Sequence, residues 1–274
     1  MSIQQDYTHC ENIIKHHSAS FYKAFKILPL SKRNAIYAIY AFCRMADDAV
    51  DIHHDRHALD LLYQQLQDFN HGNIPDTPVF RALSHVFQSF DCDTQPYFHM
   101  LEGQYLDLDF KTPLSMDEFN QYCYYVAGTV GLMLLPIIAT KNQDQLREVA
   151  LSLGSAMQIT NILRDIGEDL KINRIYIPKE VMDKHDVKDF SSGVTAEFVK
   201  MWEYMAQIAE SQYKHLSQHL HLFDQDSQKA LLRSKLFYQG ILNAVRKNHY
   251  DCLNQRAYLS SWEKMKLLLK SNYQ

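Results

Sequence analysis

Apolar residues recur with a helical period along most of this chain, and turn-forming residues rarely interrupt them. Only eight glycines and seven prolines occur in 274 residues, whereas glycine and proline typically make up about 7% and 5% of a protein. With so few turn formers the chain can reverse in few places, which disfavours β-sandwiches, β-barrels and glycine-rich nucleotide-binding sheets. The sequence therefore predicts an all-α fold of long helices joined by short connections.

The expected helices follow one another without a long linker, a repeat or a shift in composition. Their apolar spacing and the flanking Gly and Pro residues suggest where each begins and ends. The expected ranges are 31–51, 57–69, 78–90, 95–110, a helix from Ser115 through Gly128 and Gly131, 142–171, 195–222, 225–250 and 255–272. The two glycines allow a bend in that helix or a close approach to its backbone. We expect one domain over residues 1–274.

Composition and charge exclude several classes of protein. A hydrophobic content of 46% excludes a disordered chain, and a net charge of −4 argues against a nucleic-acid partner. The five cysteines form no C-x-x-C pair, so reduced thiols are expected. The N-terminus lacks the apolar core of a signal peptide, so secretion is not expected. The longest apolar run, 130–139, contains Pro136 and is far shorter than the roughly 20 residues of a membrane span. We expect a cytoplasmic protein and leave membrane association open.

The first of two acidic segments is YAFCRMADDAVD, residues 40–51. Asp47 and Asp51 are four residues apart, so on a helix their carboxylates lie one above the other. Tyr40 and Arg44 precede them on the same stripe. Like charges at this spacing cost an isolated helix about 0.2–0.5 kcal/mol per pair. The pattern therefore predicts a bound cation.

The second acidic segment is QITNILRDIGEDL, residues 158–170. Gln158, Asn161, Asp165 and Asp169 form a continuous polar stripe, whereas the opposite face is apolar. A solvated acidic face would explain either segment alone. The two segments together, each with an arginine, favour a magnesium–diphosphate site, because Mg²⁺ takes carboxylate, water and phosphate oxygens and arginine binds phosphate. A di-iron carboxylate bundle would need Glu-x-x-His motifs, and the sequence has none.

At this point the sequence resembles a known family, the trans-isoprenyl diphosphate synthases of the squalene and phytoene synthase type. The resemblance is closest to the bacterial dehydrosqualene (4,4'-diapophytoene) synthases. It spans nearly the whole chain. The Q-x-x-N-x-x-R-D-x-x-E-D motif followed by R-x-Y-x-P is its most specific part. The matching blocks are HSASFYKAF (17–25), AIYAFCRMADDAVD (38–51), EGQYLDL (102–108), YCYYVAGTVG (122–131), QITNILRDIGEDLKINRIYIP (158–178) and FYQGILNAVRKNHYD (237–251).

The resemblance implies a role for each matching residue. Those expected to bind magnesium are Asp47, Asp51, Asn161, Asp165 and Asp169. Those expected to be catalytic are Asp47, Asp51, Asp165, Asp169, Tyr122 and Arg164. Those expected to bind substrate are His17, Ser18, Ser20, Phe21, Tyr40, Arg44, Ala127, Gly131, Gln158, Asn161, Arg164, Arg174 and Tyr238. Asp107 and Tyr176 are expected to support the site. Ala19 departs from the family, whose members often carry Lys or Arg there, so one phosphate contact is missing or supplied from elsewhere.

The resemblance also implies a fold and a reaction. The fold would be a single-domain isoprenoid-synthase helical bundle with a central apolar cavity. The reaction would be head-to-head condensation of two farnesyl diphosphates through presqualene diphosphate to dehydrosqualene, releasing diphosphate, in carotenoid biosynthesis. It would use Mg²⁺ and no NADPH. The alternatives are an NADPH-dependent squalene synthase, a phytoene synthase using geranylgeranyl diphosphate, and a non-enzymatic acidic scaffold for a basic partner. An insoluble product leaves open a peripheral membrane contact and a downstream desaturase as partner.

Two further interpretations concern the floor of the cavity and the C-terminal helix. Tyr37 and Phe25 are expected to form the floor of the cavity and to limit each tail to fifteen carbons; their alternative role is ordinary core packing. The C-terminal charges Glu263, Lys264, Lys266 and Lys270 are interpreted as a solvated helix face, and Trp262 as core or interface packing.

Overall fold

The structure is a computed structural model that describes residues 2–51 and 55–271. All regular elements in these ranges are helices, without a strand, so the all-α prediction is confirmed. In chain order they are α1 (Ile3–His17), α2 (Ala19–Phe25), α3 (Leu30–Asp51), α4 (Arg56–Asn70), α5 (Pro78–Ser89), α6 (Gln95–Leu108), α7 (Met116–Cys123), η1 (Tyr124–Gly128), α8 (Thr129–Ile138), α9 (Gln143–Lys171), α10 (Lys179–Lys184), α11 (Ala196–His219), η2 (Leu220–Leu222), α12 (Gln225–Lys247) and α13 (Ser261–Lys270).

Local chemistry explains most helix boundaries. The hydroxyls of Thr77, Ser115 and Thr195 cap α5, α7 and α11 by accepting a backbone N–H three residues on. The predicted last helix, 255–272, begins only at residue 261, where Ser260 and Glu263 form a capping box. Helices α1 and α2 were not predicted.

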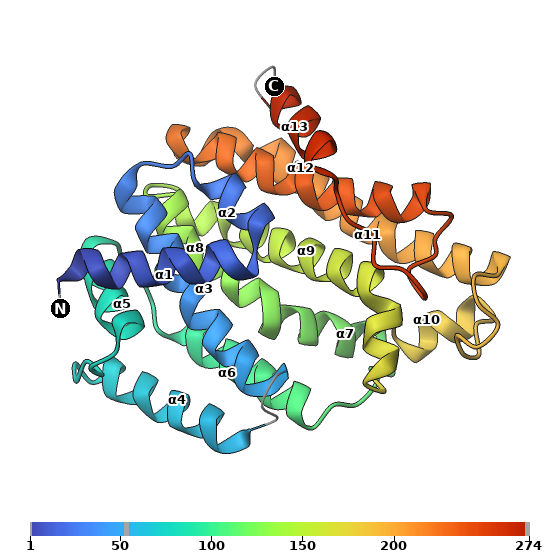
Figure 1. The fold of residues 1–274 in the computed structure, drawn as a ribbon, viewed down its shortest axis with the longest axis horizontal. Helices are drawn as coiled ribbons and strands as arrows, with labels where there is room; N and C mark the ends of the chain where they lie inside the picture. Colours follow the sequence, from blue (N-terminus) through green and yellow to red (C-terminus); the bar gives the residue numbers. More distant parts are fainter. Residues whose placement is uncertain (1, 52–54, 272–274) are drawn as a thin grey trace.

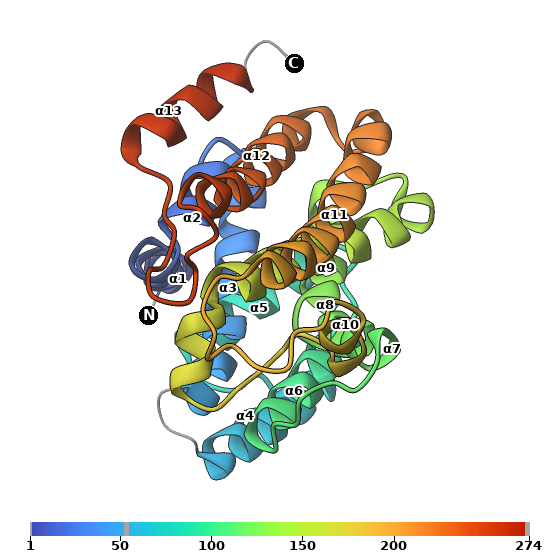
Figure 2. The same cartoon turned by 90° about the vertical axis from the view of Figure 1, so that its right-hand side faces the viewer.

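Helix α9 runs through the middle of the bundle, and α3, α8, α11 and α12 lie around it (Figure 1). It packs against α11 over the longest interface and also against α8, η1 and α12. Helices α4 and α13 lie at opposite ends of the molecule in both views (Figures 1 and 2). This arrangement places the second acidic segment, on α9, at the centre of the fold.

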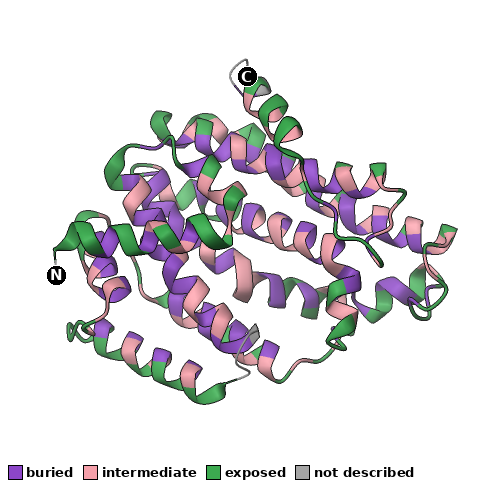
Figure 3. Cartoon of the chain, viewed as in Figure 1, coloured by how far each residue is buried: buried purple, intermediate pink, exposed green. Residues whose placement is uncertain are grey.

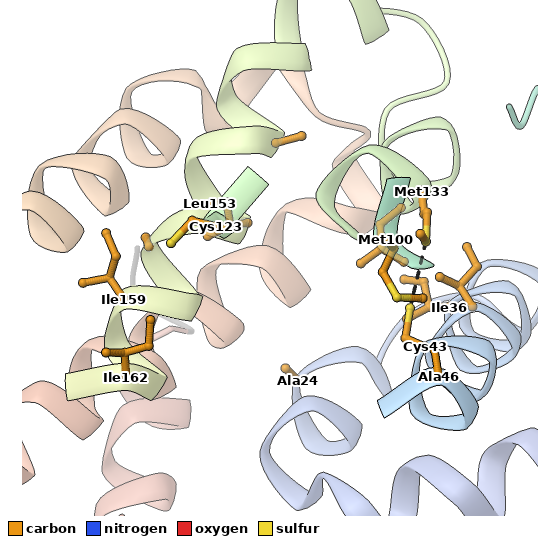
Figure 4. Close-up of a cluster of buried hydrophobic side chains, with 14 of the residues drawn as sticks. Ala24, Ile36, Cys43, Ala46, Met100, Cys123, Met133, Leu153, Ile159 and Ile162 are labelled. Carbon is orange, nitrogen blue, oxygen red and sulfur yellow. Dashed lines mark hydrogen bonds between the residues drawn. The ribbon is translucent and has the colours of Figure 1, made fainter. Parts of the chain in front are cut away.

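The buried apolar side chains form one continuous cluster, and buried residues occur along the inward faces of the central helices (Figure 3). Part of it joins Ile36, Cys43 and Ala46 of α3 to Met100 and Met133 of neighbouring helices (Figure 4). The Cys43 and Met133 sulfurs are 4.0 Å apart. All five cysteines are free, in agreement with the expected reduced thiols.

The stretch Met116–Ile138 combines α7, η1 and α8 and is long and apolar enough to cross a membrane. In the fold, 61% of its most apolar window is buried, so it serves as a core helix. A π-helical turn at Tyr124–Gly128 interrupts it, where the sequence predicted a bend. Such turns often mark functional sites.

Glycines allow this stretch to lie against α9. A Cβ on Gly131 would lie 2.3 Å from the Ala150 carbonyl oxygen, and one on Gly154 would lie 2.2 Å from that of Ala127. Because both contacts are to backbone atoms, no side-chain movement relieves them. The backbone of α9 therefore lies directly against Gly131. Gly131 thus has a packing role in addition to its expected contact with substrate.

A buried lysine joins three segments at one end of the bundle. The Lys32 ammonium donates to Asp224 (2.8 Å), Asp226 (2.6 Å) and Ser227 (3.2 Å). Asp224 also accepts the backbone N–H and hydroxyl of Thr140. The start of α3, the α8–α9 connection and the start of α12 are thereby held together.

Replacing Lys32 with Met is expected to lower the free energy of unfolding by roughly 3 kcal/mol, because two carboxylates lose their partner. Urea unfolding measures the loss. The control is Lys229→Met on the exposed face of α12, which should change stability by less than about 0.5 kcal/mol. Equal losses in the two variants would contradict the role given to Lys32.

Candidate active site

The two acidic segments face each other across a polar cavity. All four polar residues of the α9 stripe, Gln158, Asn161, Asp165 and Asp169, line it. The opposite wall comes from α3, α6, α7 and the segment after α9, and consists of Asp47, Gln104, Asp107, Tyr122 and Tyr176. The α9 stripe thus faces an internal cavity instead of bulk water.

The carboxylates at the acidic end of α3 differ in their partners and positions. Asp47 accepts a 2.8 Å hydrogen bond from the Gln104 side chain of α6. Asp48 instead pairs with Arg44, one turn earlier. Asp51 is the last residue of α3, and its side chain lies outside the described residues. Asp47 is therefore the α3 carboxylate that the structure places in the cavity wall.

Two arginines meet the Asp165 carboxylate. Arg164 donates from Nε at 2.7 Å, and Arg256, from the segment before α13, lies at 2.9 Å. Arg256 also pairs with Glu168 at 3.1 Å. The negative charge on this part of α9 is thus partly balanced by arginines.

Asp169 lies one turn beyond Asp165, where arginines do not fully balance the negative charge of the carboxylates. Burial, and then the neighbouring charge of Asp165, raise the pKa of the Asp169 carboxyl to about 7. Arg174 acts in the opposite direction but does not cancel them. Near neutral pH this carboxyl is therefore about half protonated, and a bound cation would displace the proton.

A pH dependence of stability follows for the protein without metal. The folded chain holds this proton more tightly than the unfolded chain, whose pKa is near 3.8. Stability therefore falls as the pH rises from about 4 to about 7. Asp169→Asn should raise the free energy of unfolding by on the order of 2 kcal/mol at pH 8 and hardly change it at pH 4. Thermal melts in chelator measure both, and a variant less stable than the parent at pH 8 would contradict this account.

A second set of hydrogen bonds fixes the wall opposite α9. The Asp107 carboxylate accepts from the Tyr122 hydroxyl at 3.2 Å and the Tyr176 hydroxyl at 3.1 Å. Arg174 is buried and donates to the Tyr176 oxygen and the Asp107 carbonyl. Burial and the Asp107 charge hold the pKa of Tyr122 well above its usual value. Arg174, expected to bind substrate, is thus placed behind the wall as a support for Asp107 and Tyr176.

A second cavity adjoins the first through Asp47 and Asn161. It gathers the basic and hydroxyl residues expected to bind substrate. Those residues are His17, Ser18, Ser20, Tyr40, Arg44, Arg164 and Tyr238, joined by Phe21. The Arg44 Nε is buried without a hydrogen-bond partner among the described residues. Burial and the nearby Arg44 lower the pKa of His17, which keeps its ring neutral at pH 7. Burial raises the pKa of Tyr238.

A third cavity is mostly apolar and extends from the polar ones into the bundle. Ala127, Gly131, Phe21 and Phe25 line it, with Gln158 and Asn161 at its polar side. Phe223, Ile138 and Leu231 line it as well. The Tyr37 ring instead packs on Tyr22, with centroids 5.6 Å apart. Of the two expected floor residues, the structure places Phe25 in the cavity wall.

Several polar cavity residues had been given no site role from the sequence; they include Gln104, Arg256, Tyr258 and Lys264. Gln104 lies three residues before Asp107 on α6, so the two share a helix face, and this spacing could have pointed to it. Arg256, Tyr258 and Lys264 reach the second cavity from the C-terminal segment. Ala19 and Lys264 line the same cavity, so a cation is present near the position where the family often has one.

Comparisons with known proteins agree with this geometry. Residues 14–263 match the model of the squalene/phytoene synthase family. A 4,4'-diapophytoene synthase from Staphylococcus haemolyticus (strain JCSC1435) is 34% identical over 282 residues, covering 99% of each chain. A phytoene synthase from Arthrospira platensis is 35% identical, covering 96% of this chain and 91% of its own. The crystal structure of a dehydrosqualene synthase in complex with ligand matches with a TM-score of 0.96 at 42% identity, covering 99% of this chain and 96% of that chain. This chain therefore belongs to the squalene/phytoene synthase family.

Proposed function

We propose that the protein condenses two farnesyl diphosphates head to head, through presqualene diphosphate, to dehydrosqualene and releases diphosphate. One observation carries the proposal: an acidic cavity, a cavity rich in arginine and hydroxyl groups and an apolar cavity all meet at Asn161 and Val126. Such a combination fits a substrate with a charged head and a long apolar tail. The dehydrosqualene synthase and 4,4'-diapophytoene synthase among the similar proteins support the same product.

The acidic cavity fits Mg²⁺ by the chemistry of its donors. Asp47, Asn161, Asp165 and Asp169 offer hard oxygen ligands, and Asp51 is the remaining member of the proposed set. Among the described residues, no three Asp, Glu, His or Cys side chains converge on one point. Mg²⁺ does not require such a convergence, because it takes one or two carboxylates and completes its shell with water and phosphate oxygens. When bound, Mg²⁺ would neutralise the charge of the departing diphosphate.

The protein groups around the second cavity would bind the diphosphates. Arg44 has a free buried Nε, and guanidinium groups make paired hydrogen bonds to phosphate. Arg164 lies on the border with the acidic cavity, where its donors can turn from Asp165 towards a phosphate. His17, Ser18, Ser20, Tyr40 and Tyr238 would add hydrogen bonds. These contacts would hold the first carbon of each substrate close to the other.

The apolar cavity would protect the cationic intermediates. Departure of diphosphate leaves an allylic carbocation, which water would quench, so the reacting carbons must lie in a water-free space. The double bond of the second substrate attacks this cation, and a proton is lost to give the cyclopropyl intermediate. A second ionisation, rearrangement and proton loss give the triene centre of dehydrosqualene. We propose that no reductant takes part. Tyr40, Tyr122 and Tyr238 lie near enough to the cavities to stabilise positive charge with their ring faces.

Binding of metal and diphosphate tests the first part of the proposal. A thermal melt with Mg²⁺ plus inorganic diphosphate should shift upwards, by more than either alone, because the ligands bind the folded chain. An acidic scaffold for a basic partner would show no such shift. The scaffold alternative also gives no reason for the apolar cavity beside the acidic stripes.

Chain length tests the second part, against a phytoene synthase that uses geranylgeranyl diphosphate. Phe25 is fully buried and lines the apolar cavity, so Phe25→Ala should raise the forty-carbon product from geranylgeranyl diphosphate by about tenfold, since removing the ring opens space for a longer tail. Tyr37→Ala is the matched control, because Tyr37 packs on Tyr22 instead. A larger gain in the Tyr37 variant would overturn the placement of the floor.

A further inference from the structure

The C-terminal segment presents an apolar stripe to solvent. Tyr258 is 68% exposed, and on α13 Trp262 is 59%, Met265 45% and Leu269 54% exposed. The three helical positions follow the i, i+3, i+7 spacing of one helix face. Four of the large exposed hydrophobic side chains of the described chain therefore lie within twelve residues.

The opposite face of α13 already anchors the helix to the bundle. Leu267 and Leu268 pack against the core, and Leu267 lies so close to Gly240 of α12 that a Cβ there would be 3.0 Å from its methyl group. The outward stripe is thus not needed to hold α13 in place. Helix α13 lies at one end of the molecule in both ribbon views (Figures 1 and 2), and the exposure of its stripe shows that this face is turned to solvent.

The same segment is basic, although the whole chain has a net charge of −4. Residues 256–270 contain Arg256, Lys264, Lys266 and Lys270 but only one acid, Glu263. The Lys266 ammonium lies 5.3 Å from the centroid of the Trp262 ring. Burial, and then the charge of Lys23 on α2, lower the pKa of Lys264. Exposed aromatic and aliphatic residues among lysines are the pattern of a helix that lies in the interface of an anionic membrane.

We propose that α13 docks this protein on an anionic lipid bilayer, with Trp262, Met265 and Leu269 inserted among the acyl chains. Lys266, beside the Trp262 ring, would contact the lipid phosphates. Tyr258 and Lys264 of the same segment line the basic cavity, so docking would bring that cavity to the membrane surface. Docking would allow amphiphilic substrate and hydrocarbon product to exchange with the bilayer. This role of the docking rests on the proposed function, whereas the docking itself does not.

The two tryptophans allow a direct test. Trp202 is fully buried and donates to the Leu163 carbonyl at 3.0 Å, so changes in emission report on Trp262. Vesicles of phosphatidylcholine with one-third phosphatidylglycerol should shift the emission to the blue and protect it from acrylamide. Pure phosphatidylcholine should bind more weakly. Raising the salt to about 1 M, where the Debye length is about 3 Å, should weaken binding to the anionic vesicles.

Variants separate the apolar from the charged contribution. The triple variant Trp262→Ser, Met265→Ser, Leu269→Ser should sediment with anionic vesicles at least about tenfold less well, and Lys266→Glu should reduce both binding and its dependence on salt. The control is Leu61→Ser, on α4 at the other end of the molecule and equally exposed at 48%; it should bind as the parent does. Circular dichroism establishes that each variant is folded.

Three results would overturn the proposal. They are no binding of the parent to anionic vesicles, equal binding of the triple variant, and a dimer in light scattering that the triple variant abolishes without any vesicle binding. The last would assign the stripe to a second copy of the chain. Condensation is assayed separately in detergent, where the triple variant should turn over as the parent does. If the parent catalyses no condensation in this assay, the proposed function is refuted and the docking result is unaffected.

Discussion

Replacing Asp47 with Asn is expected to lower kcat for condensation by about 100- to 1000-fold, the loss typical of one electrostatic group at a reacting centre. Asp47 lies in the acidic cavity wall and is held there by Gln104 at 2.8 Å. Asn keeps the size of the side chain and removes the charge that would bind the metal. Asp165→Asn, on the facing helix, should cause a similar loss. Steady-state rates at saturating Mg²⁺ measure both.

The double variant makes the prediction sharper. If Asp47 and Asp165 hold one metal–diphosphate assembly, the double variant should be little worse than the poorer single variant, because groups that act as a unit are not additive. The control is Asp144→Asn, near the start of α9 and exposed, which should keep the parent rate. Retained turnover in either single variant, with helical content intact, would refute the proposed metal ligands.

Replacing Gly154 with Ala is expected to have the largest effect on stability. The added Cβ would lie 2.2 Å from the Ala127 carbonyl oxygen and 2.7 Å from its carbon. Since those are backbone atoms, η1 and α9 must move apart. We expect a loss of about 3 kcal/mol or more in the free energy of unfolding, and a fall in Tm of about 6 °C or more for a chain of this size. Ala127 lines the apolar cavity, so surviving protein should also lose turnover.

Gly128→Ala is the matched control, one residue from the contact. Its Cβ would lie 3.1 Å from the flexible end of the Leu151 side chain and at ordinary van der Waals distance from Tyr124 and the Cys123 carbonyl, and alanine favours a helix by about 1 kcal/mol over glycine. Its stability should stay within about 1 kcal/mol of the parent. Chemical unfolding of both variants decides the question. Equal stability of Gly154→Ala and the parent would show that the helices do not need this close approach.

The stripe from Gln158 to Asp169 illustrates what a sequence reveals. Its period places four polar side chains on one helix face, and that face lines the cavity in the fold. Local signals such as Ser115 before α7 likewise mark the start of a helix. Periodicity and capping are properties of neighbouring residues, so they can be predicted without knowledge of the packing.

Long-range packing explains what the sequence did not reveal. Arg256 reaches Asp165 because the chain reverses after α12, where His249 and Tyr250 adopt left-handed backbone angles, φ 52° and 60°. The chain then lies against α9, and the Gly167 N–H donates to the Cys252 carbonyl at 3.0 Å. Nothing in the spacing of residues 248–260 indicates this contact. Tyr37 lines none of the three cavities for a related reason: it shares a helix face with Tyr40 and Arg44, but its ring packs on Tyr22 of α2.

The identity of the hydrocarbon formed from farnesyl diphosphate tests the central claim most directly. The protein is incubated with Mg²⁺ and farnesyl diphosphate, with and without NADPH, and the extracted products are separated and identified by mass. We predict dehydrosqualene in equal amounts under both conditions and no product when Mg²⁺ is chelated. A squalene peak that appears only with NADPH, or the absence of any thirty-carbon hydrocarbon, would contradict the account.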